Sequence, residues 1–183
     1  RAIICADEKP LIKKTRYDNI DIVTSSVKMN AISNEFVNLS DEEKQSNIIK
    51  FRQSAYDYII VDMPPAMNDF TENVLTICDY VPIELGTFAV QGLARVTQKI
   101  ANAGTKYACF ASKYDKGNKA DQELLEIMKK NLGDKVLNTV IPFSRAIKNS
   151  ISYRITASEY MSWINPARCY ERLADEIIRT VEQ

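Results

Sequence analysis

Short apolar stretches separated by polar ones divide this chain into a succession of predicted strands and helices. Runs of β-branched and aromatic residues between polar turns predict strands. The predicted strands are residues 20–23, 57–62, 80–85, 106–112 and 136–141. Apolar residues spaced three and four apart, together with capping residues, predict helices. The predicted helices are residues 40–51, 69–78, 90–103, 118–133, 145–152 and 165–181.

Single residues mark the ends of several of these elements. Gly104 and Gly133 stand where two helices are predicted to stop, and Asn118 stands where one begins. Pro82 lies inside the predicted strand 80–85. Because proline has no backbone donor, it favours an exposed edge or a locally missing ladder bond. Strands and helices therefore alternate from residue 57 onward.

This alternation predicts an α/β fold, in which a mostly parallel sheet carries helices on both faces. A length of 183 residues suits one domain with a substantial core. The sequence contains no linker, internal repeat or low-complexity tract. We therefore expect residues 1–183 to form a single α/β domain.

The amino-acid composition limits the kinds of binding site and catalysis that this chain can have. The apolar share is 45% and the charged share 26%, with no signal peptide and no apolar run near the roughly 20 residues of a membrane span. The four cysteines are far apart and form no C-x-x-C pair, which is typical of a reduced, cytoplasmic protein without a zinc site. The sequence contains no histidine, which excludes Ser-His and Cys-His catalysis.

Net charge is zero but unevenly distributed. Residues 86–156 carry twelve basic and five acidic side chains, a net charge of +7. Such a block could create a local field for a polyanion such as nucleic acid. It could equally be a set of solvated lysines on helix faces, because clustering in sequence need not mean clustering in space.

Asp62 ends the apolar run 59–61 and is followed closely by Pro64 and Pro65. An aspartate at the carboxyl end of a buried parallel strand lies where the Mg²⁺ and phosphates of a nucleotide bind. The alternative is a strand that ends on a solvated aspartate before a Pro-Pro turn.

The phosphate-binding motif that such an aspartate accompanies is absent from this sequence. No two of its five glycines are spaced as G-x-x-x-x-G-K-[ST] requires, and there is no G-x-G-x-x-G. The sequence also begins at Arg1 rather than at methionine. We therefore expect the domain to be N-terminally incomplete.

Several segments together resemble the ParA/MinD class of P-loop ATPases, and its ParA/Soj partition branch most closely. Residues 56–65 resemble the Walker B strand of that family, and residues 79–83 its next strand. The remaining similar segments are 19–26, 88–93 and 141–142. The resemblance follows the order of the family over nearly the whole chain, and it implies a P-loop NTPase-like three-layer sandwich.

The resemblance also assigns roles to residues of this sequence. Asp62 would be the Walker B aspartate, which acts on Mg²⁺ through water, and Pro64 and Pro65 would begin the switch that senses the γ-phosphate. Pro142 and Phe143 would border the adenine, together with Ser112, Lys113 and Tyr114 at the end of the preceding strand. The family's lysine-containing Walker A loop would lie upstream, so we expect this chain by itself to bind neither ATP nor Mg²⁺ and to be inactive.

As a function, the resemblance implies part of an ATPase that partitions plasmids or chromosomes. The complete parent would bind ATP and Mg²⁺, dimerise, bind DNA without sequence preference and respond to a ParB-like centromere-binding protein. It would be cytoplasmic and nucleoid-associated, with no membrane contact. The basic residues predicted to bind DNA are Lys113, Lys116, Lys119, Lys148 and Arg154.

Two alternatives remain open. One is a non-catalytic relative without the P-loop, which kept the scaffold as a DNA- or protein-binding module. The other is a MinD-like membrane-cycling ATPase. The polar face of the last predicted helix argues against the second, because acids predominate where a membrane-surface helix would carry lysine and arginine.

Overall fold

The computed structural model describes residues 12–23, 40, 56–63, 69–75, 78–85, 90–161, 163 and 165–182. By its contacts the chain divides into two compact units, Arg1–Ile77 and Cys78–Gln183. Each unit is described below by itself. The single domain expected over residues 1–183 stays a prediction.

The second unit is built on two parallel strands, β3 (Tyr80–Leu85) and β4 (Lys106–Ala111). They pair in register from Tyr80 opposite Lys106 to Leu85 opposite Ala111. Helix α4 (Val90–Asn102) connects them, so this is a βαβ crossover. The predicted boundaries of these three elements are confirmed to within one residue.

The predicted strand 136–141 runs beside β4 without forming a continuous ladder. It is joined to β4 by isolated parallel bridges and by backbone hydrogen bonds, from Leu137 N to Cys109 O (2.8 Å) and from Ile141 N to Ala111 O (2.9 Å). Between these bonds the amides of Asn138 and Thr139 donate to the Glu176 carboxylate instead. A side chain of a helix therefore takes over donors that a strand would have given to its neighbour.

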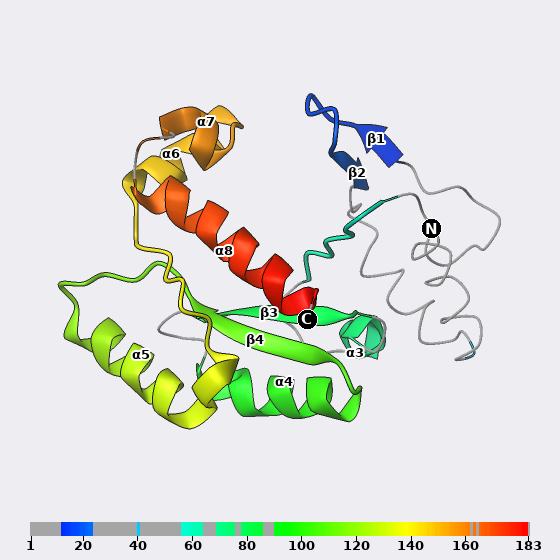
Figure 1. Ribbon diagram of the computed structural model, residues 1–183, viewed down its shortest axis with the longest axis vertical. Helices are drawn as coiled ribbons and strands as arrows, with labels where there is room; N and C mark the ends of the chain where they lie inside the picture. The colour runs from blue at the N-terminus through cyan, green and yellow to red at the C-terminus, as the bar shows by residue number, and fades with distance from the viewer. Residues whose placement is uncertain are drawn as a thin grey trace. The chain divides into compact units, whose positions relative to one another are not determined.

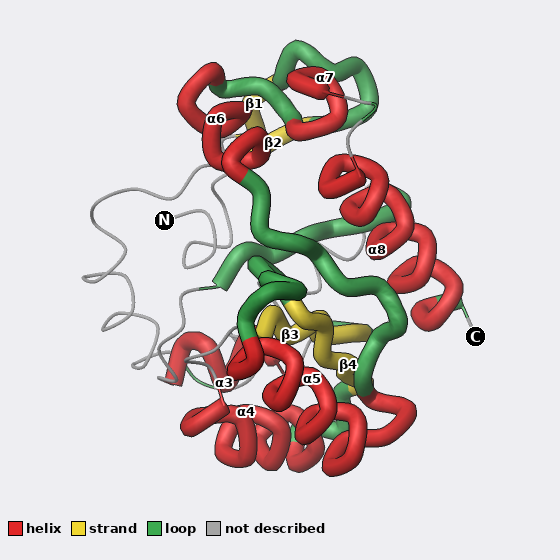
Figure 2. The backbone as a smooth tube through the Cα atoms, turned by 90° about the vertical axis from the view of Figure 1, so that its left-hand side faces the viewer, coloured by secondary structure: helices red, strands yellow, loops and turns green. Residues whose placement is uncertain are grey.

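Helices cover both faces of this sheet (Figures 1 and 2). On one face, α4 and α5 (Lys119–Leu132) pack on a core of Leu85, Cys109, Met128 and Val136. On the other face lies α8 (Asn165–Val181), whose Cys169 and Leu173 pack on a second core. That core also contains Ala108, Leu137 and Ile141. Three layers, helix, sheet and helix, result, and the α/β fold with helices on both faces is confirmed.

Helix ends follow the chemistry of the residues found there. Asn118 accepts a hydrogen bond from Ala120 N (3.0 Å) and caps α5, which ends at Gly133 with φ at 52°. Gly104 likewise has positive φ (72°) just after α4. A 3₁₀ turn, η1 (Gly133–Lys135), follows α5 directly. The signals read from the sequence therefore mark these helix ends correctly.

Beyond α6 (Arg145–Tyr153), a short helix that the sequence analysis missed, α7 (Ala157–Met161), precedes α8. Thr156 and Glu159 form a reciprocal capping box at its start, with Glu159 N donating to Thr156 Oγ1 (3.1 Å) and Thr156 N to Glu159 Oε2 (3.0 Å). This T-x-x-E spacing was the signal that could have found it.

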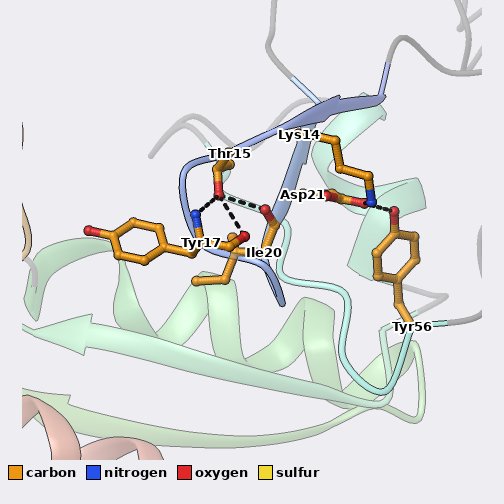
Figure 3. A network of polar contacts seen from close by, with 6 residues as sticks. All are labelled: Lys14, Thr15, Tyr17, Ile20, Asp21 and Tyr56. Atoms are coloured by element: carbon orange, nitrogen blue, oxygen red, sulfur yellow. Dashed lines mark hydrogen bonds and ion pairs between the residues drawn. The ribbon is translucent and has the colours of Figure 1, made fainter.

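In the first unit, β1 (Ile12–Lys14) and β2 (Asp21–Val23) form an antiparallel hairpin. Figure 3 shows the side chains that hold it. Thr15 Oγ1 donates a hydrogen bond to Ile20 O (2.6 Å). Asp21 Oδ2 accepts hydrogen bonds from Lys14 Nζ (2.8 Å) and from Tyr56 OH (2.5 Å). These hydrogen bonds hold the pKa of Asp21 below its ordinary value and raise that of Lys14. The hairpin confirms the predicted strand near residues 20–23, whereas β1 was not predicted.

The predicted strand 57–62 is wrong for this structure, because residues 56–63 form no strand. Its apolar side chains are exposed, Ile60 by 93%. A strand exists only when its backbone pairs with a neighbour, and none of the described strands pairs with this run. Helix α3 (Asp69–Leu75) agrees with its prediction, while the predicted helix 40–51 lies, apart from Ser40, outside the described residues.

Candidate functional site at the carboxyl edge of the sheet

The carboxyl ends of β3 and β4 lie side by side at one edge of the second unit. β3 ends at Leu85 and β4 at Ala111, and Ser112 N donates to Leu85 O (3.1 Å), which ties the loop after β4 to the neighbouring strand. Ligands of open α/β sheets bind at this edge, outside the carboxyl ends of the strands. The loop 112–118 between β4 and α5 therefore lies where a ligand is expected.

Two segments about thirty residues apart in sequence meet here. Tyr114 N donates to Ile141 O (3.1 Å), and Phe143 N donates to Tyr114 O (2.9 Å), so Tyr114 and Pro142 form a parallel bridge. Residues 112–114 and 142–143, predicted to border an adenine, are thus brought together. The Phe143 side chain is 60% exposed, which leaves its ring accessible to a flat partner. Their role in nucleotide binding stays a prediction.

A buried carboxylate of α5 orders this loop. Asp121 Oδ2 accepts a hydrogen bond from Asp115 N (2.8 Å), and Asp121 is only 8% exposed. Asp115 Oδ1 in turn accepts from Gly117 N (2.8 Å), and Gln122 Nε2 donates to Lys116 O (2.6 Å). The loop is therefore a fixed structure whose lysines project from a defined backbone.

Lys113 has an unusual conformation within this loop. Its φ is 57°, in the left-handed region that non-glycine residues adopt rarely. Its ammonium group lies 3.3 Å from Glu84 Oε1 on β3. Tyr170 of α8 lies near both: burial raises its pKa, the charge of Glu84 raises it further and the charge of Lys113 opposes this.

The other predicted DNA-binding residues divide into two groups. Lys116 and Lys119 are exposed on the loop and on the first turn of α5, close in sequence to Lys113. Lys148 and Arg154 are exposed on α6 and at its C-cap, where Arg154 has φ at 56°. Loop 112–118 leaves β4 on the left of Figure 1, and α6 lies on that side too.

Asp62, the predicted Mg²⁺ ligand, is exposed in the run 56–63 of the first unit, while Pro64 and Pro65 lie outside the described residues. In the part of the chain that the structure describes, no group of three or more His, Cys, Asp and Glu residues could hold a metal ion. At the edge of the second unit, the exposed ring of Phe143 lies next to the ordered loop 112–118. The role of Asp62 at Mg²⁺ stays a prediction, and these 183 residues contain no G-x-x-x-x-G-K-[ST] loop.

Sequence reasoning missed three acidic residues that shape this edge. Asp121 stands three residues after the N-cap Asn118, the spacing of a capping box, so its position near the helix start carried a signal. Glu84 and Glu176 carried none, because their partners, Lys113 and residues 138–139, are distant in sequence and become neighbours only through the packing of the sheet and α8.

A parallel sheet between two layers of helices, with an ordered loop at its carboxyl edge, defines an α/β protein of the open-sheet class, and this arrangement is consistent with a P-loop NTPase-like fold. A family model described as an AAA domain matches residues 4–110. Since that match covers more than half of the 183 residues, the chain belongs to this family, and within it to the P-loop ATPases of the ParA/Soj type.

Curated relatives agree with this assignment. The chain is 28% identical to the chromosome-partitioning ATPase Soj of Treponema pallidum, over 92% of its own length and 70% of the relative. It is also 28% identical to the sporulation initiation inhibitor protein Soj of Bacillus subtilis, over 94% and 72%. With the chromosome partitioning protein ParA of Caulobacter vibrioides it shares 22% identity, over 90% and 66%. Among the described helices, none is both long and apolar enough to cross a membrane.

Proposed function

We propose that this chain belongs to an ATPase that partitions chromosomes or plasmids. The names of two relatives, a chromosome-partitioning ATPase and a chromosome partitioning protein, support this function. The natural full-length protein binds ATP with Mg²⁺, dimerises, and binds DNA without sequence preference. It acts in the cytoplasm on the nucleoid, and a ParB-like protein bound to a centromere-like site is its partner.

The observation that carries this proposal is the joining of loop 112–118 to residues 142–143 at the carboxyl edge of the sheet. Backbone hydrogen bonds fix Tyr114 between Ile141 and Phe143, so residues 112–114 lie beside residues 142–143. An adenine bound here contacts the exposed ring of Phe143 and the loop backbone. The contact of Asp62 with Mg²⁺ through water is likewise proposed, from the resemblance of residues 56–65 to a Walker B strand.

DNA contact is assigned to the basic residues of the same edge. Lys113, Lys116 and Lys119 lie on an ordered loop and helix start, where cations reach the phosphates of a duplex without reading its bases. The first turn of a helix disfavours a cation such as Lys119, so its presence there favours a ligand-binding role over a stabilising one. Lys148 and Arg154, exposed on α6 and at its C-cap, are assigned to DNA contact as well.

A non-catalytic DNA- or protein-binding relative is the second candidate. It is favoured by one observation, the absence of G-x-x-x-x-G-K-[ST] from these 183 residues. ATP hydrolysis by the natural full-length protein separates the two candidates: DNA-stimulated turnover supports the ATPase, and its absence supports the binding module.

Duplex binding is tested by reversing the charge of Lys113, Lys116 and Lys119 together, to Glu, in the natural full-length protein. We expect nonspecific binding at low salt to be abolished, because phosphate contacts supply most of its free energy. A matched control reverses Lys106, Lys129 and Lys130, which are exposed and lie away from loop 112–118 along the chain. That control should retain binding. Unchanged affinity and salt dependence in the first variant would refute a phosphate-contact role for these lysines.

A further inference from the structure

The pair formed by Lys113 and Glu84 crosses the edge between two strands. Glu84 lies on β3 one residue before its end, and Lys113 follows β4 by two residues. The backbone of Lys113 is left-handed (φ 57°), and its ammonium group lies 3.3 Å from Glu84 Oε1. A conformation that costs energy at a non-glycine residue persists where the surrounding structure determines it, and such residues concentrate at functional sites.

Both members of the pair are open to solvent. The Lys113 side chain is 77% exposed and that of Glu84 50% exposed. Tyr170 of α8 lies beside them, so three polar side chains from three elements surround one place on the face of the sheet that α8 covers. A ligand can therefore reach the ammonium group of Lys113 without any movement of the core.

Among the described residues, neither neighbouring lysine of the edge has a carboxylate partner. Lys116 and Lys119 form no ion pair within the described residues, whereas Lys113 does. Of the three lysines assigned to phosphate contact, one thus already holds an anionic group of its own chain. The ion pair therefore distinguishes Lys113 from Lys116 and Lys119.

We propose that Glu84 competes with the phosphate groups of a polyanion for Lys113, and thereby sets how tightly this edge binds phosphate. The proposal rests on the proposed function, because it concerns the same lysine. An approaching phosphate carries the same sign of charge as Glu84, so it must replace the carboxylate at Lys113. Breaking the ion pair offsets most of what a phosphate contact at Lys113 contributes, so Lys113 adds little to binding in the wild type.

The test is Glu84→Gln in the natural full-length protein, titrated with duplex DNA at several salt concentrations. We expect binding about two- to fivefold tighter, the value of one exposed ion pair. The slope of log affinity against log salt should steepen by about 0.9, because one more lysine becomes free to contact phosphate. Asp134→Asn in the 3₁₀ turn η1, exposed at the other end of α5, removes the same charge elsewhere, and it should change neither quantity.

A double-mutant cycle with Lys113→Gln identifies the partner of Glu84. Lys113→Gln should weaken binding little in the wild type and about two- to fivefold in the Glu84→Gln background. Equal losses in both backgrounds, or an unchanged affinity of Glu84→Gln with an unchanged melting temperature, would overturn the proposal. A wild-type protein that binds DNA without any contribution from these lysines would refute the proposed DNA interface instead.

The source of the phosphate is distinguished by a parallel titration with ATP. A gain on duplex DNA only assigns the exchange at Lys113 to the DNA backbone, and a gain on ATP only assigns it to the nucleotide. No gain on either ligand would contradict the competition.

Discussion

Glu176 is a single residue that replaces part of a strand pairing. Its carboxylate accepts hydrogen bonds from Asn138 N (2.6 Å), Asn138 Nδ2 (3.2 Å) and Thr139 N (2.9 Å). Burial raises the pKa of Glu176, but these hydrogen bonds outweigh it and hold the pKa below the ordinary value of 4.5. The side chain thus ties α8 to the segment that runs beside β4.

Replacing Glu176 by Gln should lower the free energy of unfolding near pH 7 by about 1 kcal/mol, because charge-assisted hydrogen bonds become neutral ones. A carboxylate whose pKa is lowered by folding contributes stability above its unfolded pKa and loses it as the pH falls through the folded pKa. The difference between wild type and variant should therefore shrink below pH 4.5.

Urea denaturation of both proteins between pH 3 and pH 7 measures this difference. A difference that stays constant down to pH 3 would contradict the assigned role of the carboxylate. Glu182→Gln, near the end of the chain and exposed, serves as the control.

The buried carboxylate of Asp121 is expected to stabilise the loop before α5. Asp121→Ala leaves the amide of Asp115 without its carboxylate acceptor, and should destabilise the protein by about 1–3 kcal/mol. Hydrogen exchange at Asp115 and Gly117 should become faster, since the loop loses its support. Glu123→Ala on the exposed side of the same helix is the matched variant, and comparable exchange in both would argue against the role of Asp121.

At the scale of elements, α5 forms where several local signals agree. Asn118 caps its start, Leu124, Met128 and Leu132 pack on the core, and Gly133 ends it with positive φ. The same helix supplies Asp121 to the loop before it. One element therefore both covers a face of the sheet and fixes the loop at the candidate site.

Gly133→Ala should cost about 1–2 kcal/mol of unfolding free energy, because an alanine at φ 52° is strained. Its added Cβ would meet no atom within 4 Å, so the cost comes from the backbone and not from packing. At Gly117, which has no such φ, the added Cβ would lie 3.4 Å from Asp115 Oδ1, an ordinary contact. Thermal or urea denaturation should thus show a clearly larger loss for Gly133→Ala than for Gly117→Ala.

At the scale of the whole molecule, the 183 residues contain the predicted base-binding edge but no glycine-lysine phosphate loop. Most of the binding energy of a nucleotide triphosphate comes from groups that hold its phosphates and metal ion. We therefore predict that these 183 residues by themselves show no measurable ATP binding in isothermal titration with Mg²⁺. A low-micromolar dissociation constant would show that the phosphate site has been misplaced.

The sequence by itself determined most elements of the second unit. Strands 80–85 and 106–112, helices 90–103 and 118–133, and the stops at Gly104 and Gly133 depend on local periodicity and capping, which need no distant partner. The motifs in residues 19–26, 56–65, 79–83, 88–93 and 141–142, taken in their order along the chain, also carried the ParA/Soj resemblance. The meeting of residues 112–114 with 142–143 follows from the same order, since parallel strands end at one edge.

Tertiary structure decided the features in which a residue depends on a partner far along the chain. Residues 57–62 have a strand-like composition but form no strand, because a strand requires a paired neighbour. Residues 136–141 follow β4 only in part, because Glu176 takes two of their amides. Likewise, Glu84 meets Lys113 only because the register of β3 and β4 and the left-handed turn after β4 place them together. Such contacts depend on packing and register, which periodicity along the chain does not encode.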